Sequence, residues 1–385
     1  MASPSALTVL VVWVGYRAGP WVLRALRTAG HRVVGVHTEP HGGRSTACLR
    51  PVRCPSPVAD PEGFLAALER LARVRAADAV LPLSENAVEI LANTGGRVGG
   101  AVVVGPDAAR YRALCDKEEL GRTLAAAGLE GPVGVTVGPA GPSGPWPALP
   151  SVVKLRESAM GGSAIEVEVA SDAETRDAAV RTILAAGHEA VVQERVTGGV
   201  HWTVHAVRGG DGRFAAVLGG IVRTFPRAAG IPSVIRVLAR EGPAVDVARR
   251  LLEHVDYRGL ANVQLFECEG RFLVHDVNTR PPAPVALSIA AGLNLPALAV
   301  AAVLDRPWAP PTAPLSPFTY VSRFDELQGW LEDVRGDGAL ALVRRRVPRG
   351  GGRLVDPPLR DPLWLERMPR ALMKRTPRRL PSRVR

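Results

Sequence analysis

Residues 259–280, GLANVQLFECEGRFLVHDVNTR, decide the fold predicted for this chain. Two runs of alternating apolar and polar residues flank a turn that carries Gly270, which is the pattern of a β-hairpin. Side chains two apart on a strand share a face, so Asp276 and Asn278 project together. If the loop holds an odd number of residues, such as 269–271, Gln264 lies directly across from Asp276.

Three oxygen-bearing side chains then converge, with Arg280 just beyond the strand. Hard cations such as Mg²⁺ prefer oxygen ligands, and one or two protein ligands plus phosphate oxygens usually suffice. The alternative is a plain surface hairpin with polar residues on its solvent face.

The segments NVQL and DVNTR resemble the metal-binding hairpin of the ATP-grasp superfamily, with carbamoyl phosphate synthetase and biotin carboxylase the most similar in character. That family places Glu or Gln on the first strand and Glu-x-Asn-x-Arg on the second. The resemblance implies that Gln264, Asp276 and Asn278 bind Mg²⁺ (or Mn²⁺) on ATP, and that Arg280 faces a carboxylate or phosphoryl group. Asp276 stands where the family usually has Glu, which leaves open whether one or two metals bind.

A glycine-rich loop precedes this region, in SVVKLRESAMGGSAIEVEV. Gly161, Gly162 and Ser163 can present backbone N–H groups to phosphates, because nothing blocks close approach. Lys154 ends the preceding strand and supplies a charge for the α- or β-phosphate. The resemblance also assigns Lys117 to the phosphates, although an Asp-Lys pair on a helix is more often a solvated ion pair.

Lysine is scarce in this chain. Its three lysines are Lys117, Lys154 and Lys374, against 45 arginines. A chain that uses Arg almost everywhere keeps Lys where a compact ammonium cannot be replaced by a planar guanidinium. This suggests that the rare lysines have a specific task.

The segment AVVQERV is expected to form an edge or hinge strand. The resemblance implies that Gln193, Glu194 and Val196, the last through its backbone, contact adenine. His201 stands where the family often has the Glu that holds the ribose, and His205 where it has Asp. Both histidines could equally be packed, hydrogen-bonded strand residues.

Two further positions have competing interpretations. Residues 213–225 are expected to form another hairpin, in which Arg223 ends a strand beside the metal hairpin and serves catalysis by neutralising a phosphoryl group or holding a carboxylate. A surface arginine beside a turn is about equally compatible. The run Ser84-Glu85-Asn86 is a candidate carboxylate-substrate loop by the resemblance, but a capped helix start is preferred.

The expected fold class combines α/β and α+β parts. A buried strand at 7–14, a helix ending at Gly30 and a further strand predict a Rossmann-like α/β domain over 1–110, of the kind that precedes ATP-grasp domains. A two-subdomain ATP-grasp fold is expected over 111–305, with a lid at about 136–195. Residues 306–385 form an extension with an Arg-rich tail.

Composition bounds the remaining possibilities. With 385 residues and 46% hydrophobic content, two or three domains and a large core are expected. No apolar run is long enough to span a bilayer, and the four cysteines suit free thiols, so a cytoplasmic protein is expected. Residues 344–385 hold 14 Lys and Arg against 3 Asp and Glu, and the rest of the chain is neutral.

The expected function is an ATP-dependent carboxylate–amine ligase. By the resemblance, a small-molecule carboxylate attacks the γ-phosphate of Mg·ATP, and an amine then displaces phosphate. Its partners would be these two substrates, and a homodimer is left open. One alternative is a nucleotide-binding sensor without turnover. Another is a protein whose basic tail binds an anionic membrane or an acidic partner.

Overall fold

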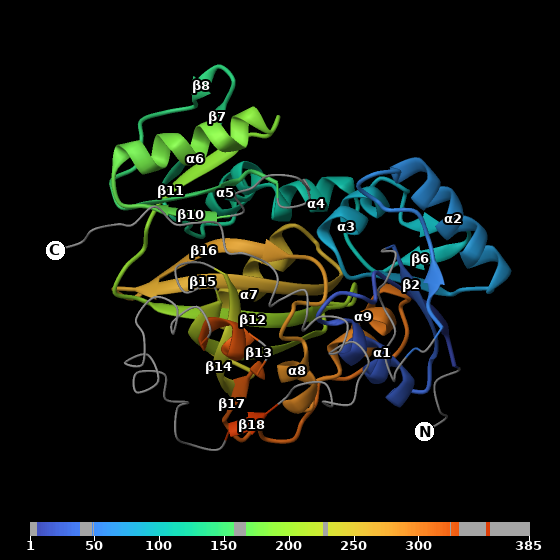
Figure 1. Ribbon diagram of the computed structural model, residues 1–385. Helices are drawn as coiled ribbons and strands as arrows, with labels where there is room; N and C mark the ends of the chain where they lie inside the picture. Colours follow the sequence, from blue (N-terminus) through green and yellow to red (C-terminus); the bar gives the residue numbers. More distant parts are fainter. Residues whose placement is uncertain are drawn as a thin grey trace.

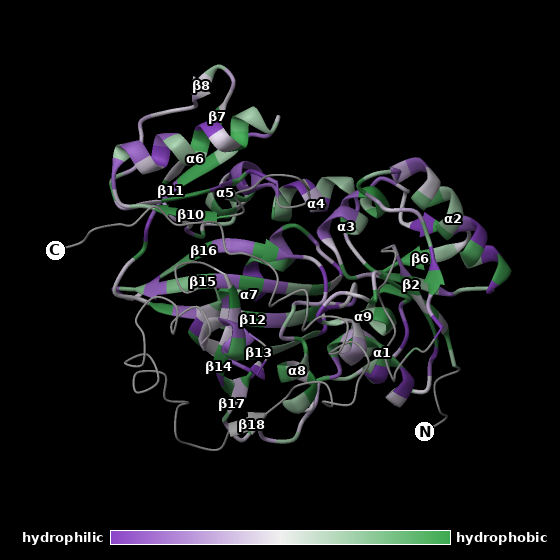
Figure 2. Ribbon diagram, in the orientation of Figure 1, coloured by the Kyte–Doolittle hydropathy of each residue, from purple (hydrophilic) through white to green (hydrophobic). Residues whose placement is uncertain are grey.

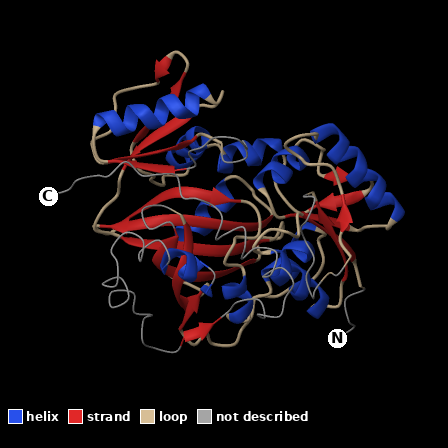
Figure 3. Cartoon of the chain, viewed as in Figure 1, coloured by secondary structure: helices blue, strands red, loops and turns tan. Residues whose placement is uncertain are grey.

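The computed structural model describes residues 6–38, 48, 50–157, 167–225, 230–323, 325–330 and 352–354. Within these ranges the chain forms three β-sheets with helices packed against them (Figures 1 and 3). The predicted mixture of α and β structure is confirmed. The glycine-rich loop over 158–166, with Gly161, Gly162 and Ser163, lies outside the described residues.

The first sheet is formed by the N-terminal part of the chain, in the strand order β3-β2-β1-β4-β6-β5. All neighbouring pairs are parallel except β5 with β6. Its strands are β1 (Thr8–Val12), β2 (Arg32–His37), β3 (Val52–Arg53), β4 (Ala79–Pro82), β5 (Arg97–Val98) and β6 (Ala101–Val103). Its helices are α1 (Gly19–Thr28), α2 (Pro61–Val74) and α3 (Glu85–Ala92).

The apolar run of β1 is buried on both faces, as expected for a central parallel strand. Val9 and Val11 pack into one hydrophobic cluster, whereas Leu10 and Val12 pack into another. Helix α2 lies over the second cluster with hydrophobic residues on one side and hydrophilic ones on the other (Figure 2). The sequence thus places its apolar residues with the period that each element needs.

The second, smaller sheet is called here the lid sheet. Its strand order is β10-β9-β11-β7-β8, and helix α6 (Ala173–Ala185) covers one face (Figure 1). The strands are β7 (Gly134–Gly138), β8 (Gly141–Pro142), β9 (Ser151–Leu155), β10 (Val167–Ala170) and β11 (Ala190–Glu194). The expectation of an edge position for the AVVQERV strand was wrong, because β11 pairs with both β9 and β7.

The third sheet has seven strands in the order β16-β15-β12-β13-β14-β17-β18, and it contains the hairpin from which the fold was predicted. Helices α4 (Ala108–Cys115) and α5 (Lys117–Ala126) lie between this sheet and the lid sheet (Figure 1). The remaining helices are α7 (Pro243–His254), α8 (Ala286–Ala290) and α9 (Leu295–Val303). The strands are β12 (Val200–Arg208), β13 (Phe214–Phe225), β14 (Ile231–Ala239), β15 (Gly259–Cys268), β16 (Arg271–Asn278), β17 (Phe318–Val321) and β18 (Gly352–Leu354).

The hairpin expected within residues 213–225 does not form, because β13 is one continuous strand that pairs with β12 and β14. Its glycines serve packing instead of a turn. A Cβ on Gly219 would lie 2.4 Å from Cγ2 of Ile235 on the neighbouring strand. Glycine is therefore needed inside this strand for close approach of a side chain.

The C-terminal region is described only in part. Strand β17 pairs with β14, so residues 318–321 belong to the third sheet, and residues 325–330 are helical. The basic tail over 355–385 lies outside the described residues. Among the described residues, no helix combines the length and apolar character required to cross a bilayer. The predicted domain boundaries, dimer and cytoplasmic location stay predictions.

Candidate functional site

The hairpin β15–β16 places Gln264 across from Asp276, as predicted, but by a different route. Its turn has two residues, Glu269 and Gly270, with positive φ of 53° and 77°. Such a turn alone would set Gln264 opposite His275, and the polar residues would face the wrong way. A bulge between Gln264 and Leu265 inserts His275 as an extra residue and restores the pairing with Asp276.

The oxygen-bearing side chains of the hairpin are half-buried and linked to one another. The Asn278 amide Nδ2 donates a 2.8 Å hydrogen bond to Oδ2 of Asp276. The amide oxygen Oδ1 of Asn278 accepts a 3.2 Å hydrogen bond from Arg280. Gln264 on β15 pairs directly with Asp276 on β16. One carboxylate and two amides therefore gather at the end of the hairpin. This donor set suits a hard cation whose other ligands are phosphate or water oxygens.

Arg280 is held by groups from the N-terminal part of the chain. Its Nε lies 2.7 Å from Oε1 of Glu85, a charge contact in which the N–H does not point along the line between the two atoms. Its Nη1 donates a 3.1 Å hydrogen bond to the Tyr16 hydroxyl, and the guanidinium lies over the Tyr16 ring. Burial opposes the charge, but Tyr16 and Glu85 favour it, so the pKa of Arg280 is raised above its ordinary value.

Glu85 reaches this position because it begins helix α3. Ser84 is the N-cap, and its Oγ accepts a 3.2 Å hydrogen bond from the backbone N–H of Ala87. The preferred interpretation of Ser84 as a helix cap is therefore confirmed. The carboxylate of Glu85 is already matched by the guanidinium of Arg280, and Asn86 stays a candidate for the carboxylate-substrate loop.

Lys154 is the next-to-last residue of strand β9 in the lid sheet and is only 7% exposed. Its ammonium donates a 3.0 Å hydrogen bond to the backbone carbonyl of His275, the bulge residue. Burial and the nearby charge of Lys117 lower the pKa of Lys154 to about 7, against the opposing effect of Asp276. The lid lysine is thereby fixed beside the hairpin carboxylate.

Lys117, at the start of α5, is buried to the same degree as Lys154, and its charge lies close enough to lower the pKa of Lys154. Its Nζ is 3.4 Å from the backbone carbonyl of Arg156, which follows β9. The Arg156 guanidinium binds Asp116 at 2.8 Å and Glu189 at 2.7 Å. Asp116 is also the N-cap of α5, so one buried carboxylate ties the lid sheet to the helix layer beneath it.

Two histidines contact each other next to this site. Nε2 of His201 lies 2.9 Å from Nε2 of His275, and both rings pack on Phe266. Burial lowers the pKa of His201 to about 4, against a hydrogen bond that its ring donates to Gln264 and the charge of Asp276, and burial lowers that of His275 well below its ordinary value. His205 is fully buried, with Nδ1 2.8 Å from Ser288 Oγ, so it is a packed core residue.

The residues proposed to contact adenine lie at the end of β11. Gln193 pairs with Gly134 on β7 and with Val152 on β9. The backbone N–H of Glu194 donates a 2.8 Å hydrogen bond to the backbone carbonyl of Val133. The side chain of Glu194 accepts from the same Val133 backbone at 3.0 Å. Val196 follows these bonded residues and is half-buried.

Arg223 lies on β13, which is separated from the hairpin β15–β16 by β12. The expectation that its strand runs directly beside the hairpin was wrong. Arg223 donates to Glu326 at 2.6 Å, and Glu326 also accepts from Ser233 at 2.7 Å. The structure thus joins it to the C-terminal helical segment, and its catalytic role stays a prediction.

The sequence interpretation missed three contributors to this site. Tyr16 carries no motif, and Asp116 was considered only as the neighbour of Lys117, so their importance follows from their contacts with Arg280 and Arg156. His275 was overlooked because a bulge has no clear sequence signature. A lone histidine between Val274 and Asp276 gave the only hint.

Comparisons with known proteins concern the family and the fold. Residues 199–323 match the model of a family described as ATP-grasp in the biosynthetic pathway with Ter operon. This match includes the hairpin β15–β16 and the strands beside it. The search of curated proteins found no match.

Several solved structures share the fold. An L-amino acid ligase from Bacillus licheniformis superposes with a TM-score of 0.63 at 17% identity, covering 77% of this chain and 75% of that one. The biotin carboxylase of Campylobacter jejuni gives 0.59 at 15%, covering 78% and 71%. The ADP complex of PurK, an N5-carboxyaminoimidazole ribonucleotide synthetase, gives 0.65 at 16%, covering 91% of each chain.

Proposed function

We propose that this chain, as an ATP-grasp protein, is an ATP-dependent ligase that activates a small-molecule carboxylate and joins it to an amine. The observation that carries the proposal is the convergence of Lys154 with Asp276, Asn278 and Arg280 at one end of the hairpin β15–β16. A cation from the lid sheet, a cation just beyond β16 and a set of oxygen donors would together suit a metal-bound triphosphate.

The first step would transfer the γ-phosphoryl group. A carboxylate oxygen of the substrate attacks the γ-phosphorus, the bond to the β-phosphate oxygen breaks, and ADP leaves. Lys154 and Lys117 would face the phosphates. Their buried ammonium groups act in a medium of low dielectric constant, where one charge counts for more than in water. Catalysis then rests on positioning and charge neutralisation.

Mg²⁺ or Mn²⁺ would be held by Asp276, Asn278 and Gln264, and it would neutralise phosphate charge when bound. The donor chemistry fits, since all three side chains offer oxygen and lie in register on the hairpin. Asn278 is oriented by its bonds to Asp276 and Arg280, which fixes the donors before any ligand arrives.

The second step would form the new bond. The amine nitrogen attacks the acyl carbon of the acyl phosphate, phosphate leaves, and the nitrogen loses a proton to solvent or to a nearby base. Arg280 would hold the carboxylate or the phosphoryl group. Its place is fixed by Glu85 and Tyr16.

Amino acids are the substrate class that this geometry favours. Glu85 and Arg280 lie side by side with their charges paired, and a free amino acid would exchange with this pair by placing its carboxylate on Arg280 and its ammonium on Glu85. The L-amino acid ligase that shares the fold provides a precedent for this class. The test is ADP formation from Mg·ATP with amino acids and small carboxylates supplied in pairs.

A pair-dependent ADP release, with formation of a dipeptide or amide detected by mass spectrometry, would support the ligase. Tight nucleotide binding with no ADP release from any pair would instead favour the nucleotide-binding sensor.

A further inference from the structure

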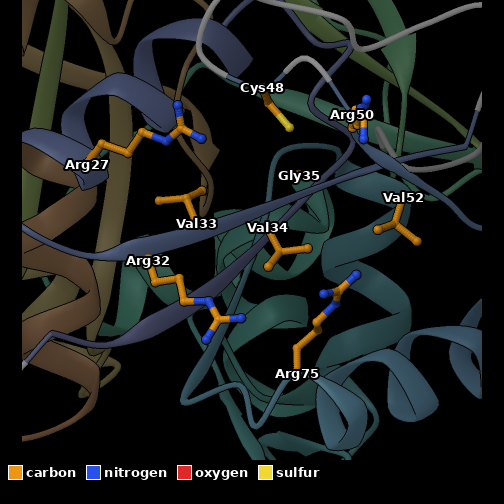
Figure 4. Close-up of a pocket in the computed structure, with 9 residues that line it drawn as sticks. All are labelled: Arg27, Arg32, Val33, Val34, Gly35, Cys48, Arg50, Val52 and Arg75. Atoms are coloured by element: carbon orange, nitrogen blue, oxygen red, sulfur yellow. The ribbon is translucent and has the colours of Figure 1, made fainter.

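A pocket of about 500 Å³ opens beside strand β2 of the N-terminal sheet (Figure 4). It lies at the amino end of this parallel sheet. Arg32 begins β2, and Arg27 and Arg75 lie at the carboxyl ends of helices α1 and α2. Ligands of open parallel sheets normally bind at the carboxyl ends of the strands, which is where Glu85 meets Arg280. The pocket is therefore separate from the proposed ligase site.

Four arginines surround the pocket, namely Arg27, Arg32, Arg50 and Arg75, and no acidic residue lines it. Within the described part of the chain, none of their guanidinium groups has a hydrogen-bond or ion-pair partner. By contrast, Arg156 contacts three carboxylates. The first 57 residues hold seven arginines against one acidic residue, so counter-charges are scarce nearby.

The pocket follows the outer edge of strand β2. Among the described strands, β3 pairs with β2 at Val36 and His37, and residues 39–47 and 49 lie outside the described part of the chain. The backbone N–H of Arg32 donates to Leu7 beside β1, so the N–H of the next residue, Val33, points to the outer edge of β2. Gly35 also lines the pocket, and a Cβ there would lie 2.8 Å from Cys48 Sγ, so glycine is needed at this position.

We propose that this pocket binds a small molecule carrying two or more phosphate or carboxylate groups. Guanidinium groups bind such oxyanions through paired hydrogen bonds. The four arginines come from two helices, a strand and the segment before β3, so they reach a ligand from several directions. Their mutual repulsion is relieved when an anion lies between them. The volume is that of an ordinary small-molecule site.

The test is calorimetric titration of the full chain with pyrophosphate, and separately with citrate. The double variant R32A/R75A removes two of the four charges. The matched control R73A/R97A removes two arginines of the same sheet region that do not line the pocket. Because both double variants keep the basic tail and have equal net charge, nonspecific attraction affects them equally.

We expect R32A/R75A to weaken the binding of at least one probe by about tenfold or more, since hydrogen bonds to charged groups are lost. The control should bind as the wild type does. Binding of pyrophosphate alone would assign phosphates, and binding of citrate alone would assign carboxylates. Equal affinities in all three proteins would overturn the proposal.

Hydrogen exchange provides a second readout that is independent of the variants. The bound probe should slow amide exchange over residues 33–35, which line the pocket along β2. Unchanged exchange of these amides at a saturating probe concentration would also contradict the site.

Discussion

The Lys154 ammonium donates a 3.0 Å hydrogen bond to the backbone carbonyl of His275, although the two residues are 121 positions apart in sequence. His275 is the extra residue of the bulge in the hairpin β15–β16. The same irregularity that sets Asp276 opposite Gln264 therefore presents the carbonyl that fixes the lid lysine. The two halves of the proposed phosphate site are joined by backbone geometry.

Lys154→Ala and Asp276→Ala should each lower ATP turnover on the order of 100-fold or more, because each removes a charge from a preorganised site. Circular dichroism and the melting temperature should show that both variants remain folded. The measurement is ADP release in a coupled assay with the best substrate pair. Turnover at the wild-type level in both variants would disprove the assignment of the nucleotide site.

Lys154→Arg tests whether a compact ammonium is needed. The charge is kept, but the planar guanidinium cannot occupy the same buried position beside the His275 carbonyl, so Mg·ATP should bind more weakly. Equal affinity, measured by calorimetry, would show that the scarcity of lysine has no bearing on this site.

Binding of Mg·ATP should take up protons at pH 8. The pKa of Lys154 is lowered to about 7, so its amine is mostly neutral above that pH in the free protein. Phosphate oxygens nearby favour the ammonium, and a proton must then be bound along with the nucleotide. Titrations in two buffers with different ionisation enthalpies measure this uptake.

The lowered pKa of Lys154 also makes the stability of the fold depend on pH. Between pH 7 and the ordinary pKa of lysine, the unfolded chain binds more protons at this position than the folded one, so its contribution to stability rises with pH. Lys154→Met should remove both the proton uptake and this dependence. Uptake that persists in that variant would assign the proton to another group.

Ser84→Ala and Glu85→Gln separate the cap of α3 from the partner of Arg280. Loss of the Ser84 cap should cost about 1 kcal/mol of stability and leave ADP release nearly unchanged. Glu85→Gln should lower turnover with little change in the melting temperature, since Arg280 loses its charged neighbour. The opposite pattern would mean that Glu85 is only structural.

Asp116→Asn should weaken the link between the lid sheet and α5. The substitution removes the negative charge that binds Arg156. It also leaves one side-chain oxygen, in place of two, to accept hydrogen bonds from Arg156 and from the start of α5. We expect a higher KM for ATP with a smaller change in kcat, because the lid lysine is positioned less well. Arg122→Ala, on the exposed side of the same helix, is the matched control and should leave both constants unchanged. A fall in kcat alone would contradict this role.

The order of the elements followed from local patterns in the sequence. Asp60 before Pro61 is a local signal for the start of α2, and its side chain accepts from the backbone N–H of Gly63 at 2.9 Å. Gly30 follows α1 with a φ of 85°, as a helix-ending glycine does. Such signals are readable because they depend on residues within one turn of each other. The hairpin expected over residues 213–225 was wrong because the reason for glycine at 219 lies in Ile235 of the neighbouring strand, which no local pattern shows.

The sequence by itself determined that Gln264, Asp276 and Asn278 share a hairpin, because alternation along a strand is a property of the chain alone. Tertiary structure decided what surrounds them. Whether Gln264 meets Asp276 depended on a bulge, whose energy comes from contacts on both sides of the sheet. Tyr16 and Glu85 reach Arg280 from more than 190 positions away. Contacts at such separation are set by how whole layers pack, and no local pattern encodes them.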